Sequence, residues 1–164
     1  PKKIATLFAN AMTDRSSPVL DIGCGTGLVA DHLVGESFAN VVGLDFSPEM
    51  LAEADQKDIY RFLIEADLEE KLLIEDATYA GAISCGTFTH GHVGPSAFRE
   101  IFRVLEQGAP FACTIHSQLW TSAGFDQALA ILENERVMSI ETISDESYFE
   151  GESADGKFCI FRKI

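Results

Sequence analysis

The feature that most restricts the fold of this chain is a run of three glycines at alternate positions, directly after a short apolar segment. Residues 19–22, Val-Leu-Asp-Ile, are followed by Gly23, Gly25 and Gly27, and the apolar residues beyond recur at helical spacing. Glycine adopts positive φ and lets a ligand approach the main chain, because it has no Cβ. A strand that ends in such a turn places it at the carboxyl edge of a sheet, where open α/β sheets bind ligands. The segment therefore predicts a ligand-binding loop.

Short β-rich runs alternate with helical periodicity along the rest of the chain. The predicted strands are residues 18–22, 40–44, 60–64, 80–84 and 110–115, and the predicted helices are 27–34, a helix capped by Ser47, 98–105 and 119–133. This alternation implies βαβ units and a parallel sheet. Two later β-like runs, 136–143 and 158–162, have no helix between them, so they must be antiparallel neighbours. We predict an α/β fold of the Rossmann-like, doubly wound type, with a mostly parallel sheet and a C-terminal antiparallel hairpin.

Size and charge limit the organisation and the partners. The 164 residues fit a single domain, residues 1–164. An amphipathic first helix, residues 4–12, is expected either to pack against the sheet or to begin a cap over the ligand, and the start at Pro1 is compatible with a cap that is incomplete. The formal net charge of −14 repels phosphate backbones, so a nucleic acid is not the expected partner. No segment approaches the roughly 18 consecutive apolar residues that span a bilayer, and no membrane association is predicted.

The cysteines predict neither a metal site nor a disulfide framework. Cys24, Cys85, Cys113 and Cys159 lie far apart, and no Cys-x-x-Cys pair is present. Each adjoins an apolar stretch, where a free cysteine behaves as a small hydrophobic residue. We expect reduced, buried thiols in a cytoplasmic protein. Nothing in the sequence indicates an oligomeric state.

Two cofactors are compatible with a glycine loop in this position. The dinucleotide fingerprint is G-x-G-x-x-G or A, whose third small residue allows close helix–strand packing, but Leu28 occupies that third position here. Gly27 gives instead G-x-G-x-G, with Asp21 two residues before the first glycine. This arrangement resembles motif I of class I S-adenosylmethionine-dependent methyltransferases, and the resemblance covers nearly the whole chain. It implies S-adenosyl-L-methionine as the cofactor and S-adenosyl-L-homocysteine as its product.

The resemblance also implies roles for individual residues. Asp45, at the end of the second strand, would accept hydrogen bonds from both ribose hydroxyls, although dinucleotide enzymes also use an acid at this place. Asp67 would contact the adenine amino group, and Met50 would pack against the adenine ring. The full set of predicted cofactor-binding residues is Asp21, Gly23, Cys24, Gly25, Gly27, Asp45, Phe46, Met50, Asp67, Leu68 and Cys85. More narrowly, residues 25–30 (Gly-Thr-Gly-Leu-Val-Ala), with a Gly-x-Val-Gly-Pro run from Gly91, are similar to the Williams–Beuren-region methyltransferase-like branch.

The acceptor pocket is expected over the ends of the fourth and fifth strands. Residues 85–92 leave the fourth strand and contain His90 and His92, the candidate catalytic residues. Because imidazole titrates near neutral pH, either histidine could accept a proton or orient an acceptor. His116, after the fifth strand, is a further candidate. The Asn-Pro-Pro-Tyr signature of amino-group methylases is absent after the fourth strand, which favours a small-molecule acceptor.

We therefore expect a methyltransferase that moves a methyl group from S-adenosylmethionine to an unidentified, small-molecule acceptor by in-line displacement, with positioning as the main source of acceleration. Two alternatives stay open at this point. One is a relative that binds the cofactor but acts as a non-catalytic partner or scaffold, because no base can be assigned. The other is an NAD-dependent oxidoreductase, which shares the fold, although Leu28 and the terminal hairpin disfavour it.

Overall fold

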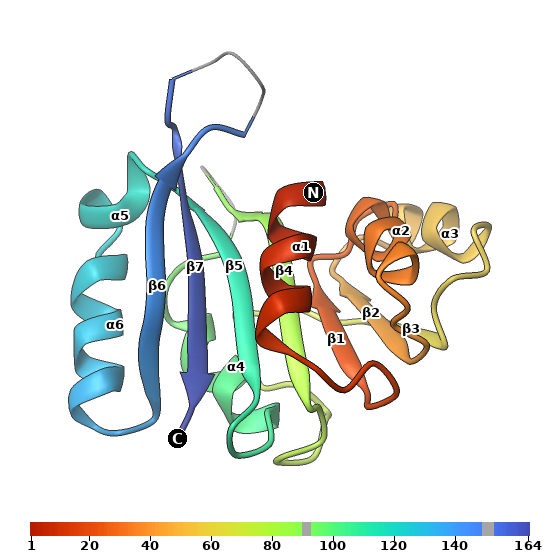
Figure 1. Cartoon of the computed structure of the whole chain (residues 1–164), viewed down its shortest axis with the longest axis horizontal. Helices are drawn as coiled ribbons and strands as arrows, with labels where there is room; N and C mark the ends of the chain where they lie inside the picture. The colour runs from red at the N-terminus through yellow and green to blue at the C-terminus, as the bar shows by residue number, and fades with distance from the viewer. Residues whose placement is uncertain (90–92, 149–152) are drawn as a thin grey trace.

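The protein is a seven-stranded sheet covered by helices, seen in a computed structural model that describes residues 1–89, 93–148 and 153–164 (Figure 1). The strands are β1 (Val19–Ile22), β2 (Val41–Asp45), β3 (Phe62–Glu65), β4 (Gly81–Phe88), β5 (Pro110–His116), β6 (Met138–Glu146) and β7 (Gly156–Lys163). The helices are α1 (Lys2–Ala11), α2 (Leu28–Gly35), α3 (Pro48–Asp55), α4 (Ala97–Val104), α5 (Leu119–Ser122) and α6 (Phe125–Asn134).

The strand order β3-β2-β1-β4-β5-β7-β6 confirms the predicted fold class. Strands β1 to β5 pair in parallel, whereas β7 is antiparallel to both β5 and β6. The chain therefore builds the sheet outward from β1 to β3 and then returns to the other side of β1 with β4. Such a reversal of strand order is a topological switch point, and ligands bind in the crevice outside the carboxyl ends of the strands there. In Figure 1 this is the upper edge of the sheet between β1 and β4.

Two apolar clusters cover the two faces of the sheet. One contains the buried residues of α4 and α6, and its centre is aromatic: the ring of Phe98 lies 4.9 Å from Phe88, 5.6 Å from Phe111 and 5.9 Å from Phe161. These four phenylalanines are fully buried. Rings at such separations add edge-to-face and tilted contacts to the burial of their area. This packing fixes β4 and β5 against α4, behind the sheet in Figure 1.

The first helix belongs to the second cluster. Ile4 and Phe8 are fully buried, and a β-carbon at Gly81 would lie 2.8 Å from both the Phe8 ring and the Met12 sulfur. Helix α1 therefore lies directly on the sheet, in front of β4 and β5 (Figure 1). Packing against the sheet, one of the two expectations for this helix, is thus confirmed. None of the helix residues lines the cavity described below.

Three predicted elements differ most from the structure. The fourth strand runs from Gly81 to Phe88 rather than over residues 80–84, so residues 85–88, which were expected to leave the strand, form its last part. The helix expected over residues 119–133 is broken into α5 and α6, because Gly124 adopts a left-handed conformation (φ 79°) that ends one helix and precedes the next. The third strand begins at Phe62 rather than at Tyr60. The side chain of Tyr60 is instead turned toward the first strand, where its hydroxyl donates to Asp21.

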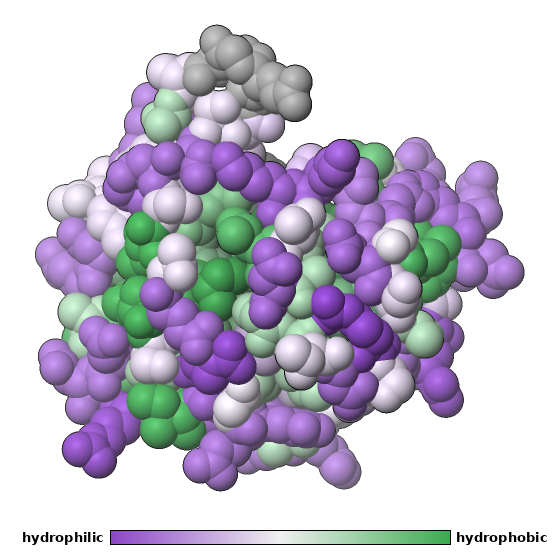
Figure 2. All heavy atoms as spheres, in the orientation of Figure 1, coloured by the Kyte–Doolittle hydropathy of each residue, from purple (hydrophilic) through white to green (hydrophobic). Residues whose placement is uncertain are grey.

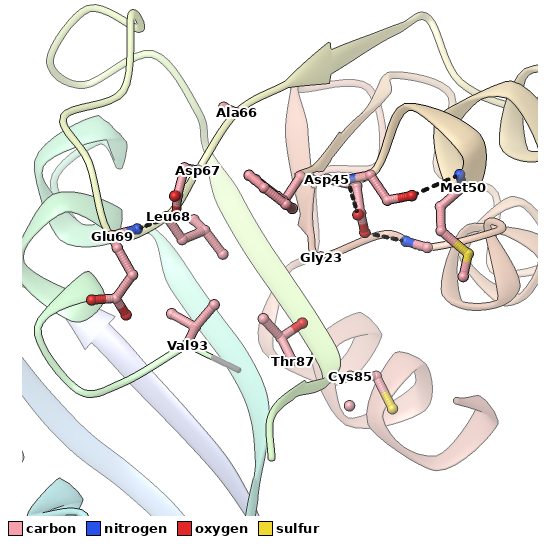
Figure 3. A pocket seen from close by; sticks show the side chains of 14 residues that line it. Gly23, Asp45, Met50, Ala66, Asp67, Leu68, Glu69, Cys85, Thr87 and Val93 are labelled. Carbon is pink, nitrogen blue, oxygen red and sulfur yellow. Dashed lines mark hydrogen bonds between the residues drawn. The ribbon is translucent and has the colours of Figure 1, made fainter. Parts of the chain in front are cut away.

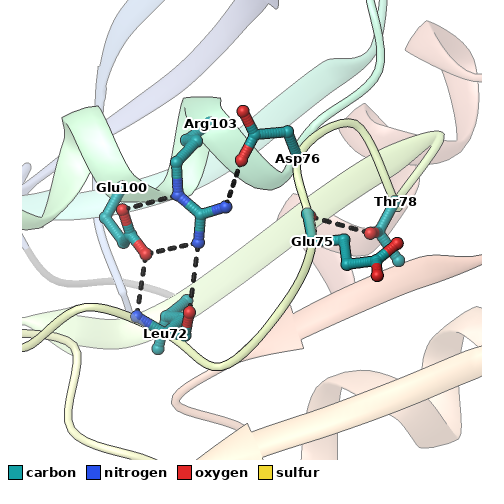
Figure 4. Close-up of polar contacts among 6 residues, drawn as sticks. All are labelled: Leu72, Glu75, Asp76, Thr78, Glu100 and Arg103. Carbon is teal, nitrogen blue, oxygen red and sulfur yellow. Dashed lines mark hydrogen bonds and ion pairs between the residues drawn. The ribbon is translucent and has the colours of Figure 1, made fainter.

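A polar cluster joins α4 to the connection after β3 (Figure 4). The Leu72 N–H donates to Glu100 Oε1 at 2.7 Å, and the Leu72 carbonyl accepts from Arg103 Nη2 at 3.2 Å. Arg103 also pairs with Glu100 and with Asp76. Because the side chain of Glu100 is only 19% exposed, loss of its arginine partner would leave a poorly hydrated charge. The cluster thus holds the segment that follows β3, part of which lines the cavity.

The surface is largely polar. Figure 2 shows apolar side chains gathered between α1 and α6, over β6 and β7, where no helix crosses this face of the sheet. Within the parts of the chain that the structure describes, no helix has the length and apolar character needed to cross a membrane.

Candidate functional site

The three loop glycines all have positive φ: 63° at Gly23, 52° at Gly25 and 84° at Gly27. Their surroundings differ. A β-carbon at Gly23 would lie 2.1 Å from Thr87 Oγ1, whereas one at Gly25 would meet nothing within 4 Å. Other residues pay a steric cost in this left-handed conformation, which glycine avoids. The loop is therefore closed against β4 at its first glycine and open to a ligand at its second.

A cavity of about 620 Å³ lies at the switch point, within the roughly 300–1,000 Å³ of typical ligand pockets (Figure 3). It is bordered by the carboxyl ends of β1, β2 and β4 and by the segments that follow β2 and β3. Its lining residues are Gly23, Gly25, Asp45, Phe46, Ser47, Met50, Ala66, Asp67, Leu68, Glu69, Cys85, Gly86, Thr87 and Val93.

Asp45 ends β2 and is directed at the glycine loop. Its Oδ2 accepts the N–H of Gly25 at 2.8 Å and its Oδ1 accepts the N–H of Ser47 at 2.9 Å. A carboxylate offers about four lone-pair sites, so these two bonds leave capacity for donors from a ligand. Ser47 then caps α3 by accepting the N–H of Met50 at 3.2 Å, with Pro48 in the first turn. This cap sets Met50, 44% exposed, on the cavity wall.

The opposite wall comes from the segment after β3. Asp67 Oδ1 accepts the N–H of Glu69 at 2.9 Å, and Glu69 Oε1 accepts the N–H of Gly94 at 2.9 Å. Leu68 between them is buried against the core. In Figure 3 this wall, with Val93, faces Asp45 and Met50 across the cavity. Each of the two walls therefore carries both apolar and acidic side chains.

The charged side chains that line the cavity, among the described residues, are all acidic: Asp45, Asp67 and Glu69. Three carboxylates with no lining Lys or Arg favour a cationic ligand over an anionic one. A pyrophosphate group would meet like charge here. The lining thus argues against a dinucleotide independently of Leu28.

Asp21 lies beneath the loop rather than on the cavity wall. It is fully buried on β1, and its Oδ2 accepts the Tyr60 hydroxyl at 2.7 Å. Its Oδ1 has no hydrogen-bond partner among the described residues. Burial raises the pKa of Asp21 to about 7, the Asp45 charge adds to the rise, and the Tyr60 hydrogen bond opposes it. This carboxyl group consequently changes charge near neutral pH.

Eight of the eleven predicted cofactor-binding residues line the cavity: Gly23, Gly25, Asp45, Phe46, Met50, Asp67, Leu68 and Cys85. The other three are Asp21, Cys24 and Gly27. Cys24 is buried, and a β-carbon at Gly27 would lie 3.1 Å from the Tyr60 ring. All three residues are buried and do not line the cavity. Cys113 and Cys159 are buried free thiols, as predicted, but Cys85 is only half-buried because it borders the cavity.

The candidate histidines do not complete the site. His90 and His92 lie outside the described residues. His116 is not among the lining residues. Its ring stacks on Tyr148 with centroids 6.4 Å apart, and its Nδ1 accepts the N–H of Gln118 at 3.3 Å. Over residues 1–89, 93–148 and 153–164, no three His, Cys, Asp or Glu side chains are grouped so as to hold a metal ion.

Sequence reasoning missed several residues that border the cavity, chiefly Thr87 and Glu69. The Thr87 hydroxyl donates to the carbonyl of Ile22 at 3.1 Å, which ties β4 to the end of β1. Its position in a predicted pocket segment, two residues after Cys85, was the available signal. Glu69 carried none, because a solvated acid and a lining acid look the same in sequence.

Comparison with known proteins places these features in a family. A model of the methyltransferase domain family matches residues 20–113, more than half of the chain. The chain is 34% identical over 87 residues to methyltransferase-like protein 27 of Homo sapiens, which covers 52% of this chain and 36% of that protein. This match supports the predicted branch. The chain is also 39% identical over 71 residues to 18S rRNA (guanine-N(7))-methyltransferase of Bos taurus, covering 43% of this chain and 25% of that protein.

The match in three dimensions is more complete than the match in sequence. The fold superposes on the crystal structure of an S-adenosylmethionine-dependent methyltransferase from Mesorhizobium loti with a TM-score of 0.76, covering 96% of each chain at 14% identity. At this identity the likeness concerns the fold alone. The chain spans less than two fifths of the length of either curated relative.

Proposed function

Because this chain belongs to the methyltransferase domain family, we propose that it binds S-adenosylmethionine in the cavity at the switch point and transfers its methyl group to a small molecule. Family membership makes it a methyltransferase rather than an oxidoreductase, with S-adenosylmethionine as cofactor and S-adenosylhomocysteine as product. The acceptor and the assignment of individual residues are our proposal. The observation that carries it is an open, acid-lined cavity at the edge of the glycine loop.

The residues present fit the cofactor. The open space at Gly25 leaves main chain accessible to the methionine part, and the spare capacity of Asp45 suits the two ribose hydroxyls. Met50 and Leu68 offer apolar surface on opposite walls for the adenine, and Asp67 offers a carboxylate for its amino group. An acidic lining complements a ligand that carries a sulfonium and an ammonium.

When bound, the cofactor supplies a methyl carbon that is already activated by its sulfonium. What the chain must then do is orient the acceptor and exclude water, because alignment of the reacting atoms can provide most of the acceleration. The irregular last part of β4, at Cys85, Gly86 and Thr87, borders the cavity and is the expected acceptor side. A base is required only for an acceptor that arrives protonated. His90 and His92 remain the candidates for that role.

A small, neutral or cationic acceptor agrees best with the electrostatics. The net charge of −14 and the three lining carboxylates oppose the approach of a polyphosphate. One relative is named as an rRNA methyltransferase, so RNA is the acceptor class against which the proposal must be tested.

We also propose a cytoplasmic location, which the free cysteines support.

Two measurements test the proposal. Calorimetry should detect binding of S-adenosylhomocysteine to the chain and weaker binding to Asp45→Asn. The control is Asp55→Asn, at an exposed carboxylate that ends α3 and lies outside the cavity. It makes the same charge change and should bind normally. Transfer of a labelled methyl group should then be screened over small amines, thiols, hydroxyl compounds and an rRNA fragment. Labelling of RNA with no small-molecule product would overturn the acceptor class, and absence of binding would overturn the cofactor site.

A further inference from the structure

Tyr60 occupies the space beneath the glycine loop. It lies in the connection between α3 and β3, far from the loop in sequence. A β-carbon at Gly27 would lie 3.1 Å from its Cε2, and one at Gly43 would lie 3.0 Å from its Cε1. The ring therefore packs closely against both glycines. The nearest neighbour of a β-carbon at Gly43 would be Leu63 Cδ2 at 2.6 Å, and Gly27 also has a positive φ of 84°. The Tyr60 hydroxyl donates to Asp21 Oδ2 at 2.7 Å. One side chain thus touches β1, β2 and the end of the loop.

The carboxyl group that Tyr60 contacts has little other support. Among the residues that the structure describes, the titratable groups facing Asp21 are Tyr60 from the α3–β3 connection, Cys24 from the loop and Asp45 from β2. On the β4 side its register partner is Ile83, which is apolar. Lys57, a cation of the α3–β3 connection, pairs its ammonium with Asp31 of α2.

The tyrosine hydroxyl is consequently the main group that favours ionised Asp21. Burial raises the pKa of Asp21 to about 7, while the hydrogen bond from Tyr60 lowers it. The second carboxyl oxygen, Oδ1, has no partner among the described residues although it is fully buried. A buried charge left half-paired is costly unless something else compensates it. A cation bound on the loop above would do so.

We infer that Tyr60 is a positioning residue for cofactor binding: it holds the buried Asp21 carboxylate under the glycine loop in its ionised form, and so couples binding of the cofactor's ammonium-bearing end to loss of a proton from Asp21. This inference rests on the proposed function. Below the pKa of Asp21 the group is neutral and attraction for a cation is lost, so affinity falls as the pH falls. Without the hydroxyl the pKa is higher, and the same fall occurs at a higher pH.

The test uses Tyr60→Phe, which keeps the ring against both glycines and removes only the hydroxyl. Tyr79→Phe, at a buried tyrosine outside the cavity, is the matched control. In the free chain, carbon-13 NMR of labelled aspartate carboxyl groups should show Asp21 titrating about one pH unit higher in Tyr60→Phe, the size expected when a hydrogen bond to a charged group is removed. Tyr79→Phe should titrate like the wild type. An unchanged Asp21 titration in Tyr60→Phe would overturn the positioning role.

Calorimetry with S-adenosylhomocysteine from pH 6 to pH 9 supplies the second readout. The ratio of wild-type to Tyr60→Phe affinity should be about fivefold at pH 7 and should approach one at pH 9, as follows from a one-unit displacement. Titration of the ligand itself cancels in this ratio. When Asp21→Asn is present, Tyr60→Phe should no longer shift the pH dependence of the affinity. A ratio that does not change with pH would indicate a purely structural tyrosine and overturn the inference. No binding by the wild type at any pH would overturn the proposed function, and the NMR titration would still decide whether Tyr60 controls Asp21.

Discussion

The buried Asp21 carboxyl group should make the stability of the fold depend on pH in a way that Asp21→Asn removes. In the folded chain its pKa is raised to about 7 from an ordinary value of 3.8, chiefly because it is buried. Between these two values the folded state holds a proton that the unfolded state has released. Raising the pH therefore lowers the free energy of unfolding across this interval. The contribution of Asp21 to the free energy of unfolding is therefore largest at acidic pH and is lost as the pH rises toward 7.

The size of the effect follows from the two pKa values. From pH 5.5 to pH 8, linkage predicts that the wild type loses about 2 kcal/mol of stability through Asp21 alone. An asparagine is neutral throughout and has no such loss. Its amide leaves a buried N–H₂ without a known partner, at a constant cost of about 1–3 kcal/mol. Because this cost does not depend on pH, it cancels when the two pH values are compared.

Urea denaturation of wild type and Asp21→Asn at both pH values measures the difference. We expect the stability of the variant relative to the wild type to increase by about 2 kcal/mol between pH 5.5 and pH 8. Asp55→Asn, at an exposed carboxylate, should show no such trend. A relative stability of Asp21→Asn that is equal at the two pH values would mean that Asp21 is ionised throughout, and the reasoning would fail.

Three further substitutions test the loop and its support. Gly23→Ala should lower stability by about 1–3 kcal/mol in thermal denaturation, because its β-carbon would collide with Thr87 Oγ1 and φ is positive; an unchanged melting temperature would refute the collision. Gly25→Ala meets nothing inside the protein, so it should cost only about 1–2 kcal/mol for its positive φ while weakening S-adenosylhomocysteine binding more than tenfold by calorimetry; wild-type affinity would place the ligand elsewhere. Arg103→Met should lower the free energy of unfolding by about 1–2 kcal/mol in urea, since the Leu72 carbonyl loses its donor; no change would mean that solvent replaces the arginine.

The parts of the fold that could be predicted are those that short, continuous stretches of sequence determine. The glycines at 23, 25 and 27 permit the positive φ of a tight turn between a strand and a helix, and the structure has positive φ at all three. Ser47-Pro48 indicates the start of a helix, which is α3. The absence of a helix between the last two strands was enough to predict their antiparallel pairing. Gly124 shows the limit, because a single glycine within helical periodicity either is tolerated or ends the helix, and packing decides which.

The parts of the site that could not be predicted depend on chain segments that meet only in the folded protein. Tyr60 reads as the first residue of a strand, but its side chain reaches Asp21 across 39 residues of sequence. The burial that raises the pKa of Asp21 is likewise a property of the packed sheet. Asp45 was predictable because it ends a strand next to the loop. Glu69 was not, since its contact with Gly94 joins two irregular segments.

The most direct test of the account is a crystal structure of the chain with S-adenosylhomocysteine. We expect density for the ligand in the cavity between Asp45 and Asp67, with the ribose hydroxyls on the Asp45 carboxylate and the amino-acid end over Gly25. Density for the ligand away from the glycine loop, or a ribose that does not contact Asp45, would contradict it.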